Sequence, residues 1–339
     1  MSRHASVIAA LFYTVIIAYD EGHLAAFSGR RRSGAMGNSR ITGIHFLLTY
    51  SCTHTCDHCF LHCSPEAHGT FTCEQLRQVF AEIERMGAVD SVYFEGGEPF
   101  LYYPLLLEGL RLAATLGLRG GIVTNAYWAT SVEDAEIWLK PIKDIGIAGL
   151  SVSDDAFHQS AGESNPAKAA LAAAMNLGVP CDTICILSPA AASCHRESPT
   201  KGQPVVGGGV LFKGRAAEKL TVGLPRRRRE ELSTCPHEEL GAPARVHLDC
   251  YGNVHICQGL SVGNMWETPL SELASEYDAR RHPICGPLSS GGPAVLAREF
   301  GLDLPDDFVD ECHYCYTVRK ALVDRFPGYL APRQVYGLS

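Results

Sequence analysis

Strand-like and helix-like segments alternate from residue 44 to about residue 215, and this alternation restricts the fold more than any other feature of the chain. Short runs rich in Ile, Val, Leu and aromatic residues are separated by stretches with helical spacing of apolar residues. Such alternation favours parallel strands with crossover helices, hence an α/β barrel or an open doubly wound sheet, with functional groups at the C-terminal strand ends. We predict strands at 44–48, 91–94, 121–124, 147–153, 181–187 and 210–212.

The intervening helices have recognisable ends. A Ser, Thr or Asn before a helix can accept a hydrogen bond from a free backbone N–H, and a glycine after it can adopt the left-handed conformation that ends it. The first of these helices also has a capping-box pattern at its start. The residues are Thr72 with Gln75, closed by Gly87; Ser131 with Asp134, before Pro141; and Asn165 with Pro166, closed by Gly178.

The chain changes character after the last predicted strand. Residues 188–209 are rich in Pro, Ser and Gly and predict a long loop that could cover the site as a lid. Four arginines at 226–229 indicate a linker with a solvated helix start, and a site for an acidic partner is the alternative. Beyond them, six cysteines fall among short strands, which predicts a small cysteine-bearing domain. We expect three parts: an N-terminal extension at 1–40, a barrel domain at 41–225 and a cysteine-bearing domain at 226–339.

Charge and cysteine content restrict the class of protein. The formal net charge of −8 gives no electrostatic reason to expect nucleic acid as a partner. Fourteen cysteines could form disulfides or bind metal, and C-x2-C spacing in a chain of 339 residues favours thiolate metal sites in a reducing compartment. We therefore expect a cytoplasmic protein.

The first residues need a separate explanation. Arg3 and His4 precede an apolar run, 5–19, that resembles a signal-peptide core but is short for a membrane span. Since the cysteine pattern favours a reducing compartment, we interpret this segment as an upstream extension with a working start at Met36. The alternative is an anchor on the inner face of a membrane.

A cysteine triplet follows the first predicted strand. Cys52, Cys56 and Cys59 have the spacing C-x3-C-x2-C. Three thiolates this close can hold three irons of a [4Fe-4S] cluster and leave the fourth iron open to a ligand. A closed zinc site fits the spacing less well, because it needs four ligands and commonly takes them in pairs. Zinc stays the alternative, since three histidines lie nearby: His54, His58 and His62.

A second motif follows the second predicted strand: Gly96, Gly97, Glu98 and Pro99. Together the triplet and this segment resemble the radical S-adenosylmethionine (radical SAM) superfamily. The resemblance implies a partial (β/α)6 TIM-like barrel, a [4Fe-4S] cluster on the triplet, and SAM bound at the open iron. It also implies that the glycine-rich segment receives the methionine amino group, with Glu98 offsetting its charge, and that His58 lies beside the adenine.

Later strand ends supply further candidates. By the same resemblance, Asn125, Ser153 and Asp154 would contact the ribose and carboxylate of SAM, although such residues also cap helices. Arg215 would bind that carboxylate or an anionic substrate group, or lie at the surface. For proton transfer during the reaction, the candidates are Asp154, His158 and Lys213.

The C-terminal cysteines resemble a second motif of the superfamily. Residues 252–257 match the G-x4-C hairpin of twitch and SPASM domains, which carry auxiliary clusters. This resemblance implies one auxiliary [4Fe-4S] cluster, and a zinc site with four thiolates is the alternative. Cys250 or Cys285 could replace one ligand of the expected set, which is Cys235, Cys257, Cys312 and Cys315.

The resemblance also implies a function. A flavodoxin or ferredoxin would reduce the cluster, SAM would be cleaved, and the 5′-deoxyadenosyl radical would abstract hydrogen from a substrate. We expect a peptide or protein substrate; the alternative is oxidation or dehydrogenation of a small molecule such as a sugar or a cofactor precursor. A non-catalytic metal-binding sensor or scaffold is the alternative of another class.

Overall fold

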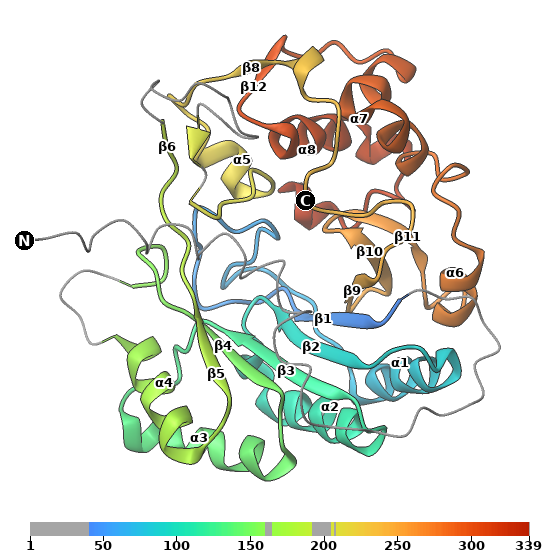
Figure 1. Cartoon of the computed structure of the whole chain (residues 1–339). Helices are drawn as coiled ribbons and strands as arrows, with labels where there is room; N and C mark the ends of the chain where they lie inside the picture. Colours follow the sequence, from blue (N-terminus) through green and yellow to red (C-terminus); the bar gives the residue numbers. More distant parts are fainter. Residues whose placement is uncertain (1–40, 160–164, 192–204, 207, 339) are drawn as a thin grey trace, which may run out of the picture. The chain divides into compact units, whose positions relative to one another are not determined.

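The computed structural model describes residues 41–159, 165–191, 205–206 and 208–338 (Figure 1). Among these residues the main sheet has eight strands in the order β11-β10-β9-β1-β2-β3-β4-β5. The neighbours from β9 to β5 are all parallel, while β10 is antiparallel to both β9 and β11. The expected α/β fold with parallel strands is therefore confirmed. The strands are β1 (Gly43–Thr49), β2 (Ser91–Gly96), β3 (Arg119–Thr124), β4 (Gly149–Ser153), β5 (Cys181–Ile184), β9 (Arg245–Asp249), β10 (Asn253–Cys257) and β11 (Leu260–Asn264).

Four helices connect these parallel strands and lie together on one side of the sheet (Figure 1). Their predicted caps are confirmed: Thr72 and Gln75 form the capping box, and Gly87 is left-handed with φ 66°. Ser131 and Asn165 each accept a backbone hydrogen bond at the start of their helices. The helices are α1 (Cys73–Met86), α2 (Tyr103–Thr115), α3 (Val132–Ile145), which runs through Pro141, and α4 (Pro166–Leu177).

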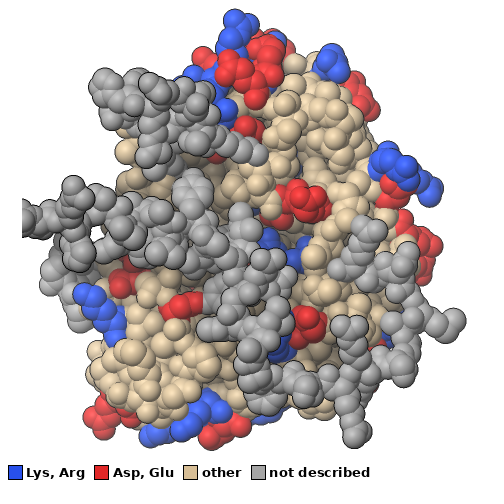
Figure 2. All heavy atoms as spheres, viewed as in Figure 1, with Lys and Arg blue, Asp and Glu red and all other residues tan. Residues whose placement is uncertain are grey.

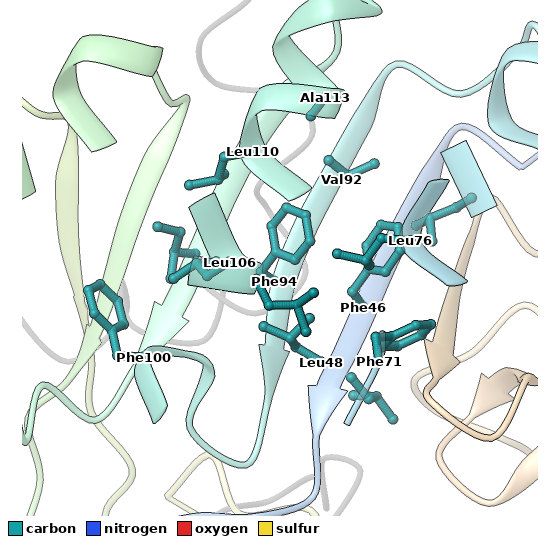
Figure 3. Packing of buried hydrophobic residues seen from close by; sticks show 14 of the residues in the cluster. Phe46, Leu48, Phe71, Leu76, Val92, Phe94, Phe100, Leu106, Leu110 and Ala113 are labelled. Carbon is teal, nitrogen blue, oxygen red and sulfur yellow. The ribbon is translucent and has the colours of Figure 1, made fainter. Parts of the chain in front are cut away.

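The core lies between this sheet and the helices. Phe46 on β1 and Phe94 on β2 are fully buried, with ring centroids 5.0 Å apart, and Phe71 and Phe80 pack on Phe46 (Figure 3). Side chains alternate along a strand. The residues directly before and after each of these two strand phenylalanines therefore face the opposite side of the sheet, away from α1 and α2. That opposite face contains polar residues from several strands.

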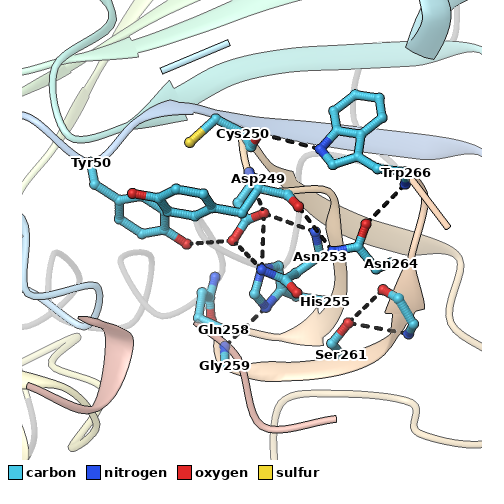
Figure 4. Close-up of polar contacts among 12 residues, drawn as sticks. Tyr50, Asp249, Cys250, Asn253, His255, Gln258, Gly259, Ser261, Asn264 and Trp266 are labelled. Atoms are coloured by element: carbon cyan, nitrogen blue, oxygen red, sulfur yellow. Dashed lines mark hydrogen bonds and ion pairs between the residues drawn. The ribbon is translucent and has the colours of Figure 1, made fainter. Parts of the chain in front are cut away.

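The C-terminal part continues the same sheet. β9 pairs with β1 from Gly43 to Leu47, and the fully buried Asp249 at the end of β9 ties the two together (Figure 4). Its Oδ2 accepts hydrogen bonds from the Tyr50 hydroxyl at 3.0 Å and from Asn253 Nδ2 at 2.9 Å, and lies 3.2 Å from His255 Nε2. Strands from both sides of the expected boundary between residues 225 and 226 thus belong to one sheet. The division into 41–225 and 226–339 stays a proposal about domains.

One predicted strand is wrong. Residues 210–212 form no strand, because a run of three residues is too short and the chain turns there into α5. Val210 and Phe212 are buried in a small cluster with Ile186, Ala216 and Val309. The remaining elements are η3 (Pro99–Tyr102), β6 (Ala190–Ala191), β7 (Val205–Val206), α5 (Arg215–Lys219), β8 (Arg227–Arg228), η4 (Arg229–Glu231), α6 (Leu270–Glu276), α7 (Cys285–Glu299), β12 (Asp307–Phe308), α8 (Glu311–Leu322), η5 (Val323–Arg325) and η6 (Arg333–Tyr336).

The four consecutive arginines pair with acidic neighbours. Arg227 donates to Glu311 at 2.9 Å, and Arg229 lies 3.1 Å from Asp306. Basic and acidic side chains accordingly lie next to one another over β8 and β12, at the top of Figure 2. The predicted lid and the N-terminal extension fall largely outside the described residues, since these omit 1–40 and 192–204. No helix in the described part is long and apolar enough to cross a membrane.

Candidate active site

The cysteine triplet lies in the loop that follows β1, at the C-terminal edge of the sheet. Cys52 is buried, Cys56 and Cys59 are half-buried, and the Cys52 backbone N–H donates to Ser64 O at 3.0 Å. Burial, together with the charges of the neighbouring thiols, raises the pKa of Cys52 to about 11 and that of Cys56 to about 12. A hydrogen bond from Cys63 instead lowers the pKa of Cys59 to about 6. The three sulfurs are close enough to influence one another, and a bound cation would favour the ionised forms of Cys52 and Cys56.

Arg215, the first residue of α5, forms hydrogen bonds with this cysteine loop. Its Nε donates to Cys56 O at 3.0 Å and its Nη2 to Cys63 O at 2.5 Å, while its backbone N–H donates to Cys59 O at 2.9 Å. Gly214 lies so close that an added Cβ would be 2.5 Å from the Phe60 backbone. The guanidinium expected to bind a carboxylate instead binds loop carbonyls.

The Gly96–Pro99 segment packs directly on the chain that leads into the triplet. Gly97 N–H donates to Thr49 O at 2.7 Å, and Glu98 N–H donates to Ser51 O at 2.9 Å. Gly96 has φ 121°, and a Cβ on Gly97 would lie 2.0 Å from Ser51 O. Only glycine permits this close approach of two backbones. The two glycines of the motif are therefore needed for packing, whether or not a ligand also needs them.

Glu98 is fully buried and bonded to the protein itself. Its Oε1 accepts from Phe100 N at 3.0 Å and Thr124 Oγ1 at 2.9 Å, and its Oε2 accepts from Asn125 N at 2.8 Å. Burial raises the pKa of Glu98 to about 7, against the effect of these hydrogen bonds. The carboxylate therefore joins the ends of β2 and β3.

Asn125 reaches the triplet from the end of β3. Its Nδ2 lies 3.1 Å from Thr53 Oγ1, 3.0 Å from His54 Nδ1 and 3.6 Å from Cys52 Sγ. Its Oδ1 accepts from Tyr127 N at 3.0 Å. The structure thus brings together Asn125, the glycine-rich segment and the cysteine loop.

His58 meets a group at the end of β4 that includes one unpredicted residue, Asp155. The donor atoms of His58, Asp155 and His158 all lie within 4.8 Å of one another, and Asp155 Oδ1 is 2.8 Å from His158 Nδ1. The His58 ring also lies 4.6 Å from that of Phe157. Burial lowers the pKa of His58 to about 4, so this ring is neutral. Asp155 gave no sequence signal beyond its place after a strand.

The neighbouring candidates at this strand end differ. Ser153 is the last residue of β4, whereas Asp154 Oδ1 accepts from Asn165 Nδ2 at 2.8 Å and so binds the residue that caps α4. Lys213 lies elsewhere: its Nζ is 2.5 Å from Gln258 Oε1 and 3.4 Å from Cys257 Sγ. Of the three residues predicted for proton transfer, only His158 contacts the group around His58.

The C-terminal thiols line one cavity with Lys213. Arg319, which is buried, also lines it and lies with Nη2 3.8 Å from Cys257 Sγ. Cys250 and Cys285 are not among the residues that line this cavity; Cys250 lies near Gly69 and Cys285 is buried at the start of α7. The lining cysteines are Cys235, Cys257, Cys312 and Cys315.

Residues 46–189, which contain the triplet and the Gly96–Pro99 segment, match the family model of the radical SAM superfamily. This part of the chain belongs to the radical SAM superfamily. Its parallel sheet with flanking helices fits the radical SAM partial-barrel type. Membership implies a [4Fe-4S] cluster, SAM and a source of electrons.

Two curated relatives match part of the chain. The Bacillus subtilis protein YydG, named for peptide biosynthesis, is 24% identical over 111 residues, which are 33% of this chain and 35% of YydG. An S-adenosylmethionine-dependent nucleotide dehydratase from Selenomonas ruminantium is 28% identical over 82 residues, which are 24% of this chain and 29% of that protein. The chain thus spans only about a third of the length of each relative.

Solved structures with a similar chain path include two further proteins. BtrN, in complex with AdoMet and 2-DOIA, is 17% identical, with a TM-score of 0.46 over 69% of this chain and 82% of BtrN. Streptococcus suis SuiB bound to S-adenosylmethionine is 11% identical, with a TM-score of 0.36 over 70% of this chain and 66% of SuiB. We draw no conclusion about the site from likenesses this low.

Proposed function

We propose that this radical SAM enzyme holds its [4Fe-4S] cluster on Cys52, Cys56 and Cys59 and abstracts hydrogen from a peptide or protein. The observation that carries the first part is the set of three interacting thiols at the C-terminal edge of a parallel sheet. Three thiolates fit a cubane cluster with one open iron. When bound, the cluster and SAM would supply reductive cleavage to methionine and a 5′-deoxyadenosyl radical.

The protein's own residues would position SAM and exclude water. Gly96 and Gly97 bring their backbone against the loop before Cys52, which fits an ammonium group approaching carbonyl oxygens. The neutral, half-buried His58 would lie beside the adenine, and Asn125 Nδ2 would donate to the ribose or the carboxylate. Glu98 would act indirectly, by fixing the backbone of Asn125.

A second [4Fe-4S] cluster on the cavity thiols is part of the proposal. Four cysteines line one cavity, which is the number that a closed cluster needs. Lys213 and Arg319 approach Cys257 Sγ at 3.4 and 3.8 Å, and these cations would stabilise the thiolate. The supporting geometry does not require Cys250 or Cys285.

The choice of a peptide rests on the naming of YydG for peptide biosynthesis. A small-molecule substrate is the competing possibility, because the Selenomonas ruminantium relative is named for a nucleotide. We further propose a flavodoxin or ferredoxin as reductant and the cytoplasm as compartment, since thiolate clusters need reducing conditions.

Formation of 5′-deoxyadenosine tests the chemistry. Anaerobically reconstituted full-length protein should release it from SAM when dithionite is added, and Cys56→Ala should not. Cys73→Ala is the matched control, because Cys73 is exposed on α1 and should leave the release unchanged. Wild-type protein that contains iron and sulfide yet releases no 5′-deoxyadenosine would contradict the proposal.

Iron content tests the second cluster separately. The triple variant Cys52→Ala, Cys56→Ala, Cys59→Ala should keep about four irons per chain, and a further Cys312→Ala change should remove them. A triple variant without iron would contradict the second cluster and leave only the proposed cluster on Cys52, Cys56 and Cys59. For the substrate, candidate precursor peptides encoded next to this gene should be incubated with the enzyme and examined by mass spectrometry, with nucleotides as the competing test set.

A further inference from the structure

A cluster of two histidines and one glutamate lies on the face of the sheet that points away from α1 and α2. His45 on β1, Glu95 on β2 and His247 on β9 come from three adjacent parallel strands. His45 pairs in register with His247, and all three donor atoms lie within 4.8 Å of one another. Three strands joined by hydrogen bonds hold these side chains more rigidly than a loop would.

The separations fit ligands that share one ion. His45 Nδ1 lies 3.4 Å from Glu95 Oε2, and His247 Nε2 lies 3.2 Å from Glu95 Oε1. Nitrogen and oxygen ligands about 2.0–2.2 Å from one zinc ion would be separated by a similar distance. His45 Nδ1 is buried and has no hydrogen-bond partner among the described residues, although it points towards the carboxylate.

Gln258 indicates where the proton of His247 lies. Lys213 can only donate, and its Nζ is 2.5 Å from Gln258 Oε1, so the amide NH2 faces His247 Nε2 at 3.1 Å. That nitrogen therefore presents a lone pair, and the ring proton is assigned to Nδ1. An ionised Glu95 presents lone pairs to the same nitrogen. A cation between His247 Nε2 and Glu95 would remove this repulsion, and it would displace the Gln258 NH2 from the same lone pair.

The charge states of His247 and Glu95 without an ion agree with a metal site. Burial lowers the pKa of His247 to about 4, so its ring is neutral at pH 7. His45 beside it, acting against burial, holds the pKa of Glu95 well below its ordinary value. A neutral imidazole and an ionised carboxylate are the forms that bind metal. His45 and Glu95 each keep 19% of their side-chain surface exposed, which leaves a path for an ion.

We propose that His45 Nδ1, a Glu95 carboxylate oxygen and His247 Nε2 bind one divalent first-row transition ion, for which zinc is the test case. Two imidazoles and one carboxylate are a common ligand set for zinc and for non-haem iron. Three protein ligands leave a position open, where the ion could polarise a substrate oxygen. This site shares no residue with either cysteine set.

Cobalt(II) is the probe, because it substitutes for zinc and its absorption reports the ligands. Imidazole and carboxylate give only weak visible bands, whereas thiolates add an intense near-ultraviolet band. Beyond any cobalt held by the two cysteine sets, full-length protein should bind one further equivalent that shows only the weak bands and is displaced by zinc. His247→Ala and Glu95→Gln should lose these bands, whereas Gln258→Leu should bind cobalt at least as tightly as wild type, because its amide no longer competes for the lone pair of His247 Nε2. His68→Ala, outside the cluster, should behave as wild type.

Folding is checked on the same samples. Zinc should raise the Tm of wild type but not that of His247→Ala, and His45→Asn is the milder variant if His247→Ala unfolds. The proposal would be overturned if the further equivalent with weak bands survived in both Glu95→Gln and His45→Asn, or if wild type showed thiolate bands only. Either result leaves the 5′-deoxyadenosine assay unaffected.

Discussion

At the scale of single residues, the buried carboxylate of Glu98 is the clearest case of a motif residue with a structural task. The sequence placed it beside a methionine ammonium, but its oxygens are occupied by donors from Phe100, Thr124 and Asn125. The motif could be recognised from its letters, whereas the direction of its side chain depends on β3, which lies more than twenty residues further along. Local patterns do not contain that information.

We expect Glu98→Gln to destabilise the protein by about 1–3 kcal/mol, because the amide group turns an NH2 towards one of three donors. Urea unfolding measures the change. The release of 5′-deoxyadenosine should also fall, since the backbone of Asn125 loses its anchor. Glu267→Gln, at an exposed position, is the control. Equal stability of the two variants would show that the three hydrogen bonds contribute little.

His62 should make stability depend on pH. Burial lowers its pKa from 6.5 to about 4 in the folded protein, so the unfolded chain takes up a proton first. Its contribution is therefore complete above about pH 6.5 and is lost as the pH falls towards 4. Its φ of 56° is left-handed, which asparagine tolerates. His62→Asn should thus lose less stability than wild type in urea unfolding between these pH values. An unchanged slope would exclude His62 as a source.

At the scale of elements, the ends of helices could be predicted from the sequence more readily than the pairing of strands. The caps at Thr72, Ser131 and Asn165 are confirmed because each depends on residues within one turn. The pairing of β9 with β1 joins strands about 200 residues apart and left no local pattern. The expected strand at 210–212 failed for a related reason: its apolar residues found burial against α5 and residue 309 without a sheet partner.

Asp249 should contribute more to stability than a typical polar residue, because it accepts hydrogen bonds from several elements. We expect Asp249→Asn to lower the free energy of unfolding by about 2–3 kcal/mol, since an amide NH2 would face Tyr50, Asn253 or His255. Guanidinium unfolding followed by far-ultraviolet circular dichroism checks this. Asp303→Asn, which is exposed, should change stability by no more than about 0.5 kcal/mol.

At the scale of the whole molecule, the bond between Tyr50 and Asp249 sets an order of events during synthesis. The two residues are 199 positions apart, and β9 is the neighbour that covers the free edge of β1. A nascent chain therefore carries an open strand edge beside its cysteine loop until the ribosome has passed β9, and open edges invite association. A fragment ending at residue 240 should scatter light at concentrations where the full chain does not. Iron insertion would then be a post-translational event, available only to chains that have been completed.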